Sequence, residues 1–159
     1  ALCITLGVLI GYFTFHTPAC TTVVIPIGIP QPLNSIEDWG EREVNCLRDV
    51  IYNESRNQGT AGQIAVAAVV INRVLDSRWP AKICSVTRQA NQFAAWTPRP
   101  ANVLERRALA TAERLAIYTL NNYTRLGEDV KSYKYFNSGS PKHANITTIG
   151  DHHFSEEHV

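Results

Sequence analysis

The sequence predicts an α+β fold that is mainly helical, with a small lobe of strands and loops after Gly127. Two observations support this prediction. Apolar residues recur at helical spacing in three segments between residues 35 and 121, which gives each segment one apolar face. After Gly127 this spacing is lost, and short aromatic or β-branched stretches around a Gly-Ser-Pro turn are typical of strands. A chain of 159 residues is long enough to bury one hydrophobic core.

The first helix of the domain is expected to begin at Ser35, because Ser35 and Asp38 form a variant of the capping box. A second helix is expected from Thr60 to Leu75, where Thr60 and Gln63 repeat the capping signal. This second helix is almost wholly apolar, so we expect it to lie in the core. The positions that mark the core face of the first helix are Ile36, Trp39, Val44, Leu47, Val50 and Ile51.

A third helix is expected over residues 102–121, followed by strands around residues 133–136 and 146–149. Asn72 and Arg73, near the end of the second helix, are expected to hold that helix to the strand lobe. The predicted inner face of the third helix consists of Leu104, Ala108, Leu109, Ala112, Leu115, Ala116 and Leu120.

Residues 1–34 differ from the rest of the chain, since no charged residue precedes Glu37. Residues 1–15 are nearly all apolar but fall short of the ~20 residues that cross a bilayer. This run is typical of a signal peptide core or a signal anchor. There are two alternatives: a helix that packs against a partner protein, and a helix buried in the domain's own core. Prolines make residues 16–34 a linker or an edge segment. We therefore expect an anchor-like segment with its linker over 1–34 and the folded domain over 35–159.

The overall composition is that of an ordinary globular protein, with 45% hydrophobic and 18% charged residues. The formal net charge is +1. It gives no electrostatic case for a nucleic-acid partner, which would need a clustered basic face.

Glu54 is the residue of greatest chemical interest. It ends the first helix, and the polar turn 57–59 separates it from the apolar second helix. A carboxylate at the mouth of a helix hairpin is well placed for acid–base chemistry. The plain alternative is a surface glutamate near a helix end.

Glu54 also belongs to the first of six short sequence blocks in the region from residue 44 to residue 154. In their residues and their order these blocks closely resemble the sequences of the SleB-type cell-wall hydrolases of bacteria and bacteriophages. One block alone would be a weak signal, but six in order are specific. The blocks are Tyr52-x-Glu54-x-Arg56, Gly62-Gln63, Asn72-Arg73, Trp79-Pro80 with Cys84-x-Val86, Gln92-Phe93, and Ile149-Gly150-x-His152-x-Phe154.

The resemblance implies a lysozyme-like fold and cleavage of the peptidoglycan glycan strand between N-acetylmuramic acid and N-acetylglucosamine. Glu54 stands at the position of the family's catalytic glutamate, and we expect no cofactor. Two departures occur: many members carry a second glutamate where this chain has Gln58, and an aromatic residue where it has Ser155. The first departure makes a mechanism with two carboxylates less expected. It favours a lytic transglycosylase, in which the 6-hydroxyl of the muramic acid itself attacks intramolecularly. A muramidase is the alternative.

Four residues at family-like loop and strand positions are expected to hold the glycan through flat aromatic surfaces and amide hydrogen bonds. They are Gln92, Phe93, Tyr135 and Asn137. For Phe93 and Tyr135 the alternative is packing in the core.

Several relatives carry cysteines at the positions of Cys46 and Cys84. A disulfide between them would fit an oxidising compartment outside the cytoplasm, and two buried free thiols are the alternative. We therefore expect a location in the periplasm or cell envelope, with peptidoglycan as the partner. Residues 1–15 could also associate with a membrane or be buried in a larger assembly. A phage lysis enzyme and a virion-associated enzyme are both forms of this hypothesis.

Two rival functions remain. One is a structural virion component that keeps the fold with little activity. The other is a metal-dependent amidase, with ligands drawn from His143, His152, His153, Asp151 and Glu54. The spacing does not match a helix-borne zinc motif, and adjacent histidines on a strand point to opposite faces. The simpler expectation is that one histidine of the pair at 152–153 packs inward beneath Glu54 and the other faces solvent.

Overall fold

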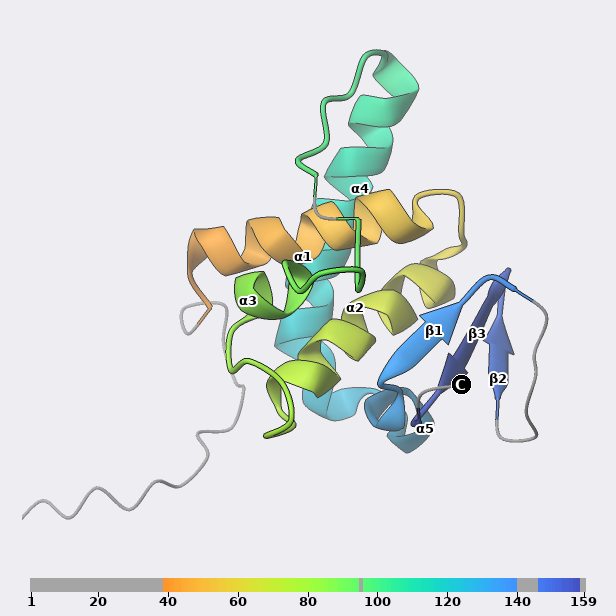
Figure 1. Cartoon of the computed structure of the whole chain (residues 1–159). Coiled ribbons are helices and arrows are strands. Elements are labelled where there is room, and N and C mark those ends of the chain that lie inside the picture. Colours follow the sequence, from red (N-terminus) through yellow and green to blue (C-terminus); the bar gives the residue numbers. More distant parts are fainter. Residues whose placement is uncertain (1–38, 95, 140–145, 158–159) are drawn as a thin grey trace, which may run out of the picture. The chain divides into compact units, whose positions relative to one another are not determined.

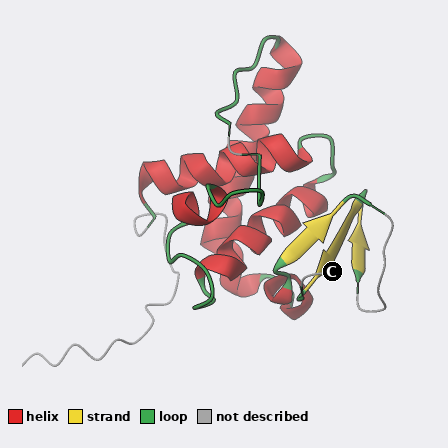
Figure 2. Cartoon of the chain, viewed as in Figure 1, coloured by secondary structure: helices red, strands yellow, loops and turns green. Residues whose placement is uncertain are grey.

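The computed structural model describes residues 39–94, 96–139 and 146–157, and it confirms a mainly helical α+β fold (Figures 1 and 2). The predicted anchor and the linker over residues 1–34 lie outside the described residues. Within the described part, no helix is long and apolar enough to cross a membrane. The helices are α1 (Gly40–Ser55), α2 (Thr60–Val74), α3 (Ile83–Thr87), α4 (Val103–Asn122), the 3₁₀ helix η2 (Tyr123–Arg125) and α5 (Glu128–Ser132). The strands are β1 (Tyr135–Asn137), β2 (Thr147–Ile149) and β3 (His152–Ser155).

Helix α2 forms the centre of the core, as its apolar sequence predicts. It contacts α1, α3, α4, α5 and the strands β1 and β2, so apolar neighbours surround it (Figure 1). Each fully buried valine or isoleucine side chain contributes roughly 1.5–3 kcal/mol relative to its exposed state. The buried residues of α2 are Gly62, Gln63, Ala65, Val66, Ala67, Ala68, Val69, Val70, Ile71, Asn72 and Arg73.

The predicted start of the first helix was wrong by a few residues, whereas α2 begins at Thr60 as predicted but with a different N-cap. Helix α1 begins at Gly40, after the predicted Ser35, because Gly40 has a φ of +52° and so takes the chain through the left-handed region. The N-cap of α2 is Gly59 and not Thr60. The side chain of Gln63 does not close a capping box but donates to the carbonyl of Gln58, at 2.8 Å.

Helix α4 begins as predicted, because the Asn102 side chain accepts a hydrogen bond from the Glu105 N–H at 2.9 Å. One predicted core residue was wrong: the side chain of Leu104 is 74% exposed. The first turns of α4 extend past α1, where no element covers them (Figure 1). The fully buried apolar residues of α4 lie further along the helix, at Ala112, Ala116 and Leu120.

The three strands form one antiparallel sheet in the order β1-β3-β2. Tyr135 lies opposite Ser155, and Thr148 lies opposite His153. The strands predicted around residues 133–136 and 146–149 are confirmed with slightly different bounds, as β1 and β2, and the fully buried Phe154 of β3 anchors the sheet to the core. The short helices α3 and α5 were not predicted; each is five residues long, too short to show a helical repeat.

Asn72 joins the end of α2 to the lobe, as the sequence predicts. Its amide nitrogen donates to the carbonyls of Val130 at 2.9 Å and Tyr133 at 2.6 Å. Its amide oxygen accepts a hydrogen bond from the Tyr123 hydroxyl. One buried side chain therefore satisfies three polar groups from three later segments of the chain.

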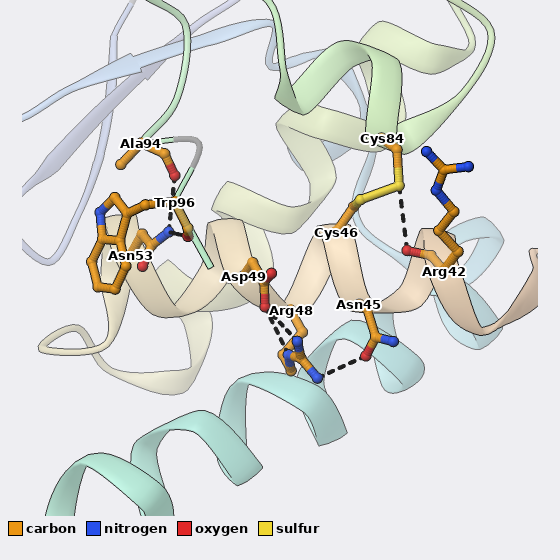
Figure 3. Close-up of polar contacts among 9 residues, drawn as sticks. All are labelled: Arg42, Asn45, Cys46, Arg48, Asp49, Asn53, Cys84, Ala94 and Trp96. Carbon is orange, nitrogen blue, oxygen red and sulfur yellow. Dashed lines mark hydrogen bonds and ion pairs between the residues drawn. A yellow bond between two sulfur atoms is a disulfide. The ribbon is translucent and has the colours of Figure 1, made fainter. Parts of the chain in front are cut away.

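Cys46 and Cys84 form the expected disulfide, which ties α1 to α3 (Figure 3). The same junction is reinforced by the Cys84 N–H, which donates to the Glu43 carboxylate at 3.0 Å.

We predict that Asn72→Ala lowers the free energy of unfolding by about 3 kcal/mol, because buried partners would lose their hydrogen bonds. Asn122→Ala is a suitable control, since the Asn122 amide donates only to the exposed carbonyl of Tyr118 in its own helix. Denaturant unfolding measures both variants. A similar small loss in the two would contradict the structural role of Asn72.

We predict that Cys46→Ala/Cys84→Ala also lowers the free energy of unfolding by about 3–4 kcal/mol, because the disulfide closes a loop with a sequence separation of 38. Reduced wild-type protein should lose a similar amount in the same denaturation experiment. A loss below about 1 kcal/mol in both samples would show that the crosslink does not stabilise this fold as the loop-entropy argument requires.

Candidate active site

Glu54 lies in the last turn of α1 and is partly buried. Its Oε1 atom accepts a hydrogen bond from the Ala94 N–H at 2.6 Å. Among the described residues this is the one hydrogen bond of the carboxylate. The second oxygen, Oε2, is therefore available to exchange a proton with a bound molecule.

Asn53 holds the same loop that contacts Glu54. Its amide nitrogen donates to the carbonyl of Ala94 at 2.9 Å and to the carbonyl of Trp96 at 2.8 Å (Figure 3). The adjacent residues Asn53 and Glu54 thus bind the carbonyl and the N–H of Ala94, respectively. These two hydrogen bonds fix the position of the N–H that donates to Glu54. Sequence reasoning missed Asn53, because an asparagine near a helix end has no pattern that distinguishes this role from an ordinary surface position.

Trp96 is a second residue that the sequence interpretation missed. Its side chain is 50% exposed, and its ring meets the Tyr52 ring edge-on, with centroids 6.3 Å apart. It also lines a small cavity of about 50 Å³ together with Asp49, Thr87 and Thr97. An exposed aromatic ring beside Ala94 offers a flat surface next to the candidate carboxylate.

Arg73 brings together three of the four predicted glycan-binding residues. Its Nη1 atom donates to the Gln92 side-chain oxygen at 2.9 Å. Its guanidinium lies over the rings of Phe93 and Tyr135, 5.1 and 5.2 Å from their centroids. It also donates to the carbonyl of Lys134 at 2.7 Å, so it joins α2 to the lobe, as predicted. Burial lowers the pKa of Arg73, while the Tyr135 hydroxyl opposes this shift.

The side chains of these four residues differ in how far they are exposed on the surface. The Phe93 side chain is 9% exposed and belongs to the hydrophobic core, so it presents little surface. Tyr135 is partly exposed, and Gln92 is exposed. Asn137 lies at the exposed end of β1, apart from Arg73, where its side-chain oxygen accepts from the Gly139 N–H at 3.1 Å. A role of the four residues in binding a glycan stays a prediction.

The two adjacent histidines of β3 have different surroundings. His152 is 6% exposed and meets the Phe136 ring edge-on at 5.2 Å. Burial lowers the pKa of His152, and the negative charges of Glu54 and Asp151 partly oppose this effect. His153 is more exposed, and its Nδ1 lies 2.9 Å from the Thr148 hydroxyl. The prediction that one histidine of the pair packs inward is confirmed, and its place beneath Glu54 stays a prediction.

The other carboxylates that could assist Glu54 already have partners. Asp49 accepts two hydrogen bonds from Arg48, at 2.8 and 2.6 Å (Figure 3). Asp151 accepts from the Gln58 amide at 3.0 Å. Within the described ranges, no group of three or more His, Cys, Asp or Glu side chains could hold a metal ion, and His143 lies outside these ranges.

We predict that His152 makes the stability of the protein depend on pH. Burial lowers its pKa below the ordinary value of 6.5, so just below that pH the unfolded chain binds more protons than the folded one. The free energy of unfolding therefore falls as the pH is lowered through about 6.5 and below. We expect His152→Gln to show a weaker fall between about pH 7 and pH 5 in denaturant titrations.

His153→Gln is the matched control for this experiment, because it removes a histidine of the same strand but keeps His152 in place, so it should show a steeper fall than His152→Gln. An unchanged slope in His152→Gln would contradict the burial of a neutral histidine at this position.

Comparison with known proteins places the chain in a family. Residues 57–155 match the family model described as cell wall hydrolase. The spore cortex-lytic enzyme of Bacillus cereus is 32% identical over 57 residues, covering 36% of this chain and 22% of that protein. The spore cortex-lytic enzyme of Oceanobacillus iheyensis is 27% identical over 63 residues, covering 40% and 23%. The chain thus spans less than a quarter of the length of these relatives.

Solved structures show a similar fold. The catalytic domain of the germination-specific lytic transglycosylase SleB from Bacillus anthracis superposes with a TM-score of 0.50 at 23% identity, over 73% of this chain and 95% of that domain. The catalytic domain of the Bacillus cereus SleB protein gives a TM-score of 0.48 at 24% identity, over 73% and 91%. The family match begins just after Glu54 and covers most of the described domain, and we conclude that the chain belongs to the cell wall hydrolase family.

Proposed function

We propose that this chain cleaves the glycan strand of peptidoglycan between N-acetylmuramic acid and N-acetylglucosamine, with Glu54 as the catalytic acid and base. The observation that supports this most strongly is the setting of the Glu54 carboxylate. Its Oε1 atom is held at 2.6 Å by the Ala94 N–H, and its Oε2 atom accepts no hydrogen bond from the described residues. Membership of the cell wall hydrolase family supplies the substrate class.

The proposed mechanism needs one carboxyl group. Protonated Glu54 donates its proton to the glycosidic oxygen as the bond to the anomeric carbon breaks. The 6-hydroxyl of the muramic acid then attacks that carbon, and the Glu54 carboxylate takes the hydroxyl proton. The product is a 1,6-anhydro sugar, and no water is consumed. If water attacks instead, the same two proton transfers give hydrolysis, as in a muramidase.

Two observations favour the route with one carboxylate. Asp49 forms an ion pair with Arg48, and one oxygen of Asp151 accepts from the Gln58 amide, so each of these carboxylates has a structural partner of its own. In addition, the SleB domain of similar fold from Bacillus anthracis is described as a lytic transglycosylase.

The glycan would be held in part by two aromatic side chains. Trp96 offers an exposed ring in the loop that binds Glu54, and Tyr135 offers a partly exposed ring in β1. Stacking of such rings on the apolar faces of sugars buries surface without requiring a charged partner. The amides of Gln92 and Asn137 can form hydrogen bonds with sugar hydroxyls or acetamido groups. Phe93 acts from the core, where it supports Arg73 and Gln92.

The proposed substrate locates the protein at the cell envelope. We extend the proposal to a domain over residues 35–159 that carries the activity and to an anchor or signal segment with its linker over residues 1–34. A phage lysis enzyme or a virion-associated enzyme would use the same domain on the same polymer. A virion component with little activity remains the competing function.

We predict that Glu54→Gln lowers the rate of clearing of a peptidoglycan suspension by at least about 100-fold, the loss expected when a general acid is removed. The fold should be intact, because the glutamine oxygen can still accept from the Ala94 N–H. Asp49→Asn, on the same helix, is the matched control and should stay within about 3-fold of wild type, since its carboxylate is not asked to transfer a proton. Near-wild-type clearing by Glu54→Gln would reject the catalytic assignment.

A further inference from the structure

The turn between α1 and α2 and the turn between β2 and β3 are joined by one side chain. The Gln58 amide nitrogen donates to the Asp151 carboxylate at 3.0 Å, and the Gln58 amide oxygen accepts from the Asp151 N–H at 3.0 Å. Gln58 is buried, although it lies in a polar turn. Figure 1 shows the two turns next to each other, at the edge of the sheet away from α5.

The backbone at this joint is shaped to let the two turns approach closely. Gly150 has a φ of +62°, and a Cβ atom added there would overlap the Gln58 side-chain oxygen. A Cβ atom added at Gly62 would lie 3.2 Å from the Gln58 Cβ, so the first turn of α2 also closes around this side chain. Glycines on both sides of Gln58 therefore leave the space that its amide occupies.

The chemistry of the joint requires a neutral amide. Gln58 must accept from a backbone N–H and donate to a carboxylate, and an amide offers one group of each kind. A glutamate at this position could still accept from the N–H. Its second oxygen would face the Asp151 carboxylate at hydrogen-bond distance, and two like charges this close repel each other.

The joint adjoins the end of the helix that carries the candidate catalytic group, because the Gln58 N–H donates to the carbonyl of Ser55, the residue after Glu54, at 2.8 Å. On the other side of the joint, Asp151 immediately precedes the buried His152. At the other end of the lobe, Asn72 and Arg73 bind the carbonyls of Tyr133 and Lys134. Those bonds hold the segment that leads into β1, whereas the Gln58–Asp151 bonds hold the β2–β3 turn.

We infer that Gln58 and Asp151 are positioning residues, whose paired hydrogen bonds lock the β2–β3 turn onto the α1–α2 turn and so hold the start of β3, with the buried His152, at the end of the helix that carries Glu54. This inference rests on the proposed function only for its catalytic consequence. The docking of the two turns can be measured without any substrate.

A charge exchange tests the inference. Gln58→Glu should lower turnover on soluble glycan chains by at least about 10-fold and should speed hydrogen exchange at the amides of β2 and β3, since two carboxylates then face each other. Adding Asp151→Asn should reverse both changes. The amide then present at position 151 can donate to the carboxylate at position 58, and the backbone N–H of residue 151 can still donate to that carboxylate. Asp151→Asn alone is the reference for the double variant.

Gln63→Glu is the matched control, because Gln63 is also a buried glutamine of the α1–α2 hairpin but donates to the Gln58 carbonyl and not to Asp151. Its effects should not be reversed by Asp151→Asn. The inference is supported if Asp151→Asn restores turnover and slow hydrogen exchange to Gln58→Glu but not to Gln63→Glu. It is overturned if both variants recover equally or if neither recovers. If Gln58→Glu does not fold, folding restored by Asp151→Asn supports the inference, and failure to restore it overturns it.

The exchange measurement keeps this test separate from the proposed function. If the wild-type chain shows no activity on glycan, the proposed function fails, while recovery of amide protection in Gln58→Glu/Asp151→Asn still supports the joint. If wild-type activity is high and Gln58→Glu leaves both turnover and exchange unchanged, the proposed function stands and the positioning role is rejected.

Discussion

The burial of α2 on all sides is the constraint on which the rest of the structure depends. A helix in this position gains the free energy of its apolar residues only if the polar groups carried into the core with it find partners. Asn72 and Arg73 meet this condition near its C-terminal end, by binding carbonyls of Val130, Tyr133 and Lys134. The same bonds attach the strand lobe to the helical part, so the stability of the core and the placement of the lobe have one cause.

The candidate site follows from this arrangement. The Gln58–Asp151 hydrogen bonds hold the β2–β3 turn to the turn that follows α1, and Arg73 holds Gln92 in the loop that leads to Ala94. Asn53 binds the carbonyl of Ala94, whose N–H donates to Glu54. The carboxylate is thus positioned by this loop, which the neighbouring residue of the same helix holds in place. Such positioning, achieved before a substrate binds, is what acid–base catalysis requires of its groups.

Much of this fold could be predicted from sequence, and the reasons differ between elements. Long segments with a clear helical repeat, such as α2 and α4, were found because the repeat persists over several turns. The start of α1 was missed because Ser35 and Asp38 look like a cap, whereas the backbone of Gly40 decides where the helix begins. Leu104 fits the inner face of α4 by spacing, but spacing does not tell whether a neighbouring element reaches that turn.

Candidate site residues could be named from the sequence only where they belong to a recognisable block or to a position shared with relatives. Glu54, His152 and the Cys46–Cys84 pair were named in this way; the structure has the disulfide and the inward histidine, and the catalytic role of Glu54 stays a prediction. Asn53, Trp96 and the bonding of Gln58 could not be found, because their partners lie some 40 or 90 residues away in sequence. No local pattern records which distant backbone group a side chain will meet.

The central claim is that this chain cuts the glycan strand with one carboxyl group. Mass spectrometry of purified sacculi incubated with the protein, with and without a metal chelator, tests it most directly. The account predicts soluble muropeptides that end in 1,6-anhydro-muramic acid and are equally abundant with the chelator present. Release of stem peptides from intact glycan strands, or no soluble product from correctly folded protein, would contradict it.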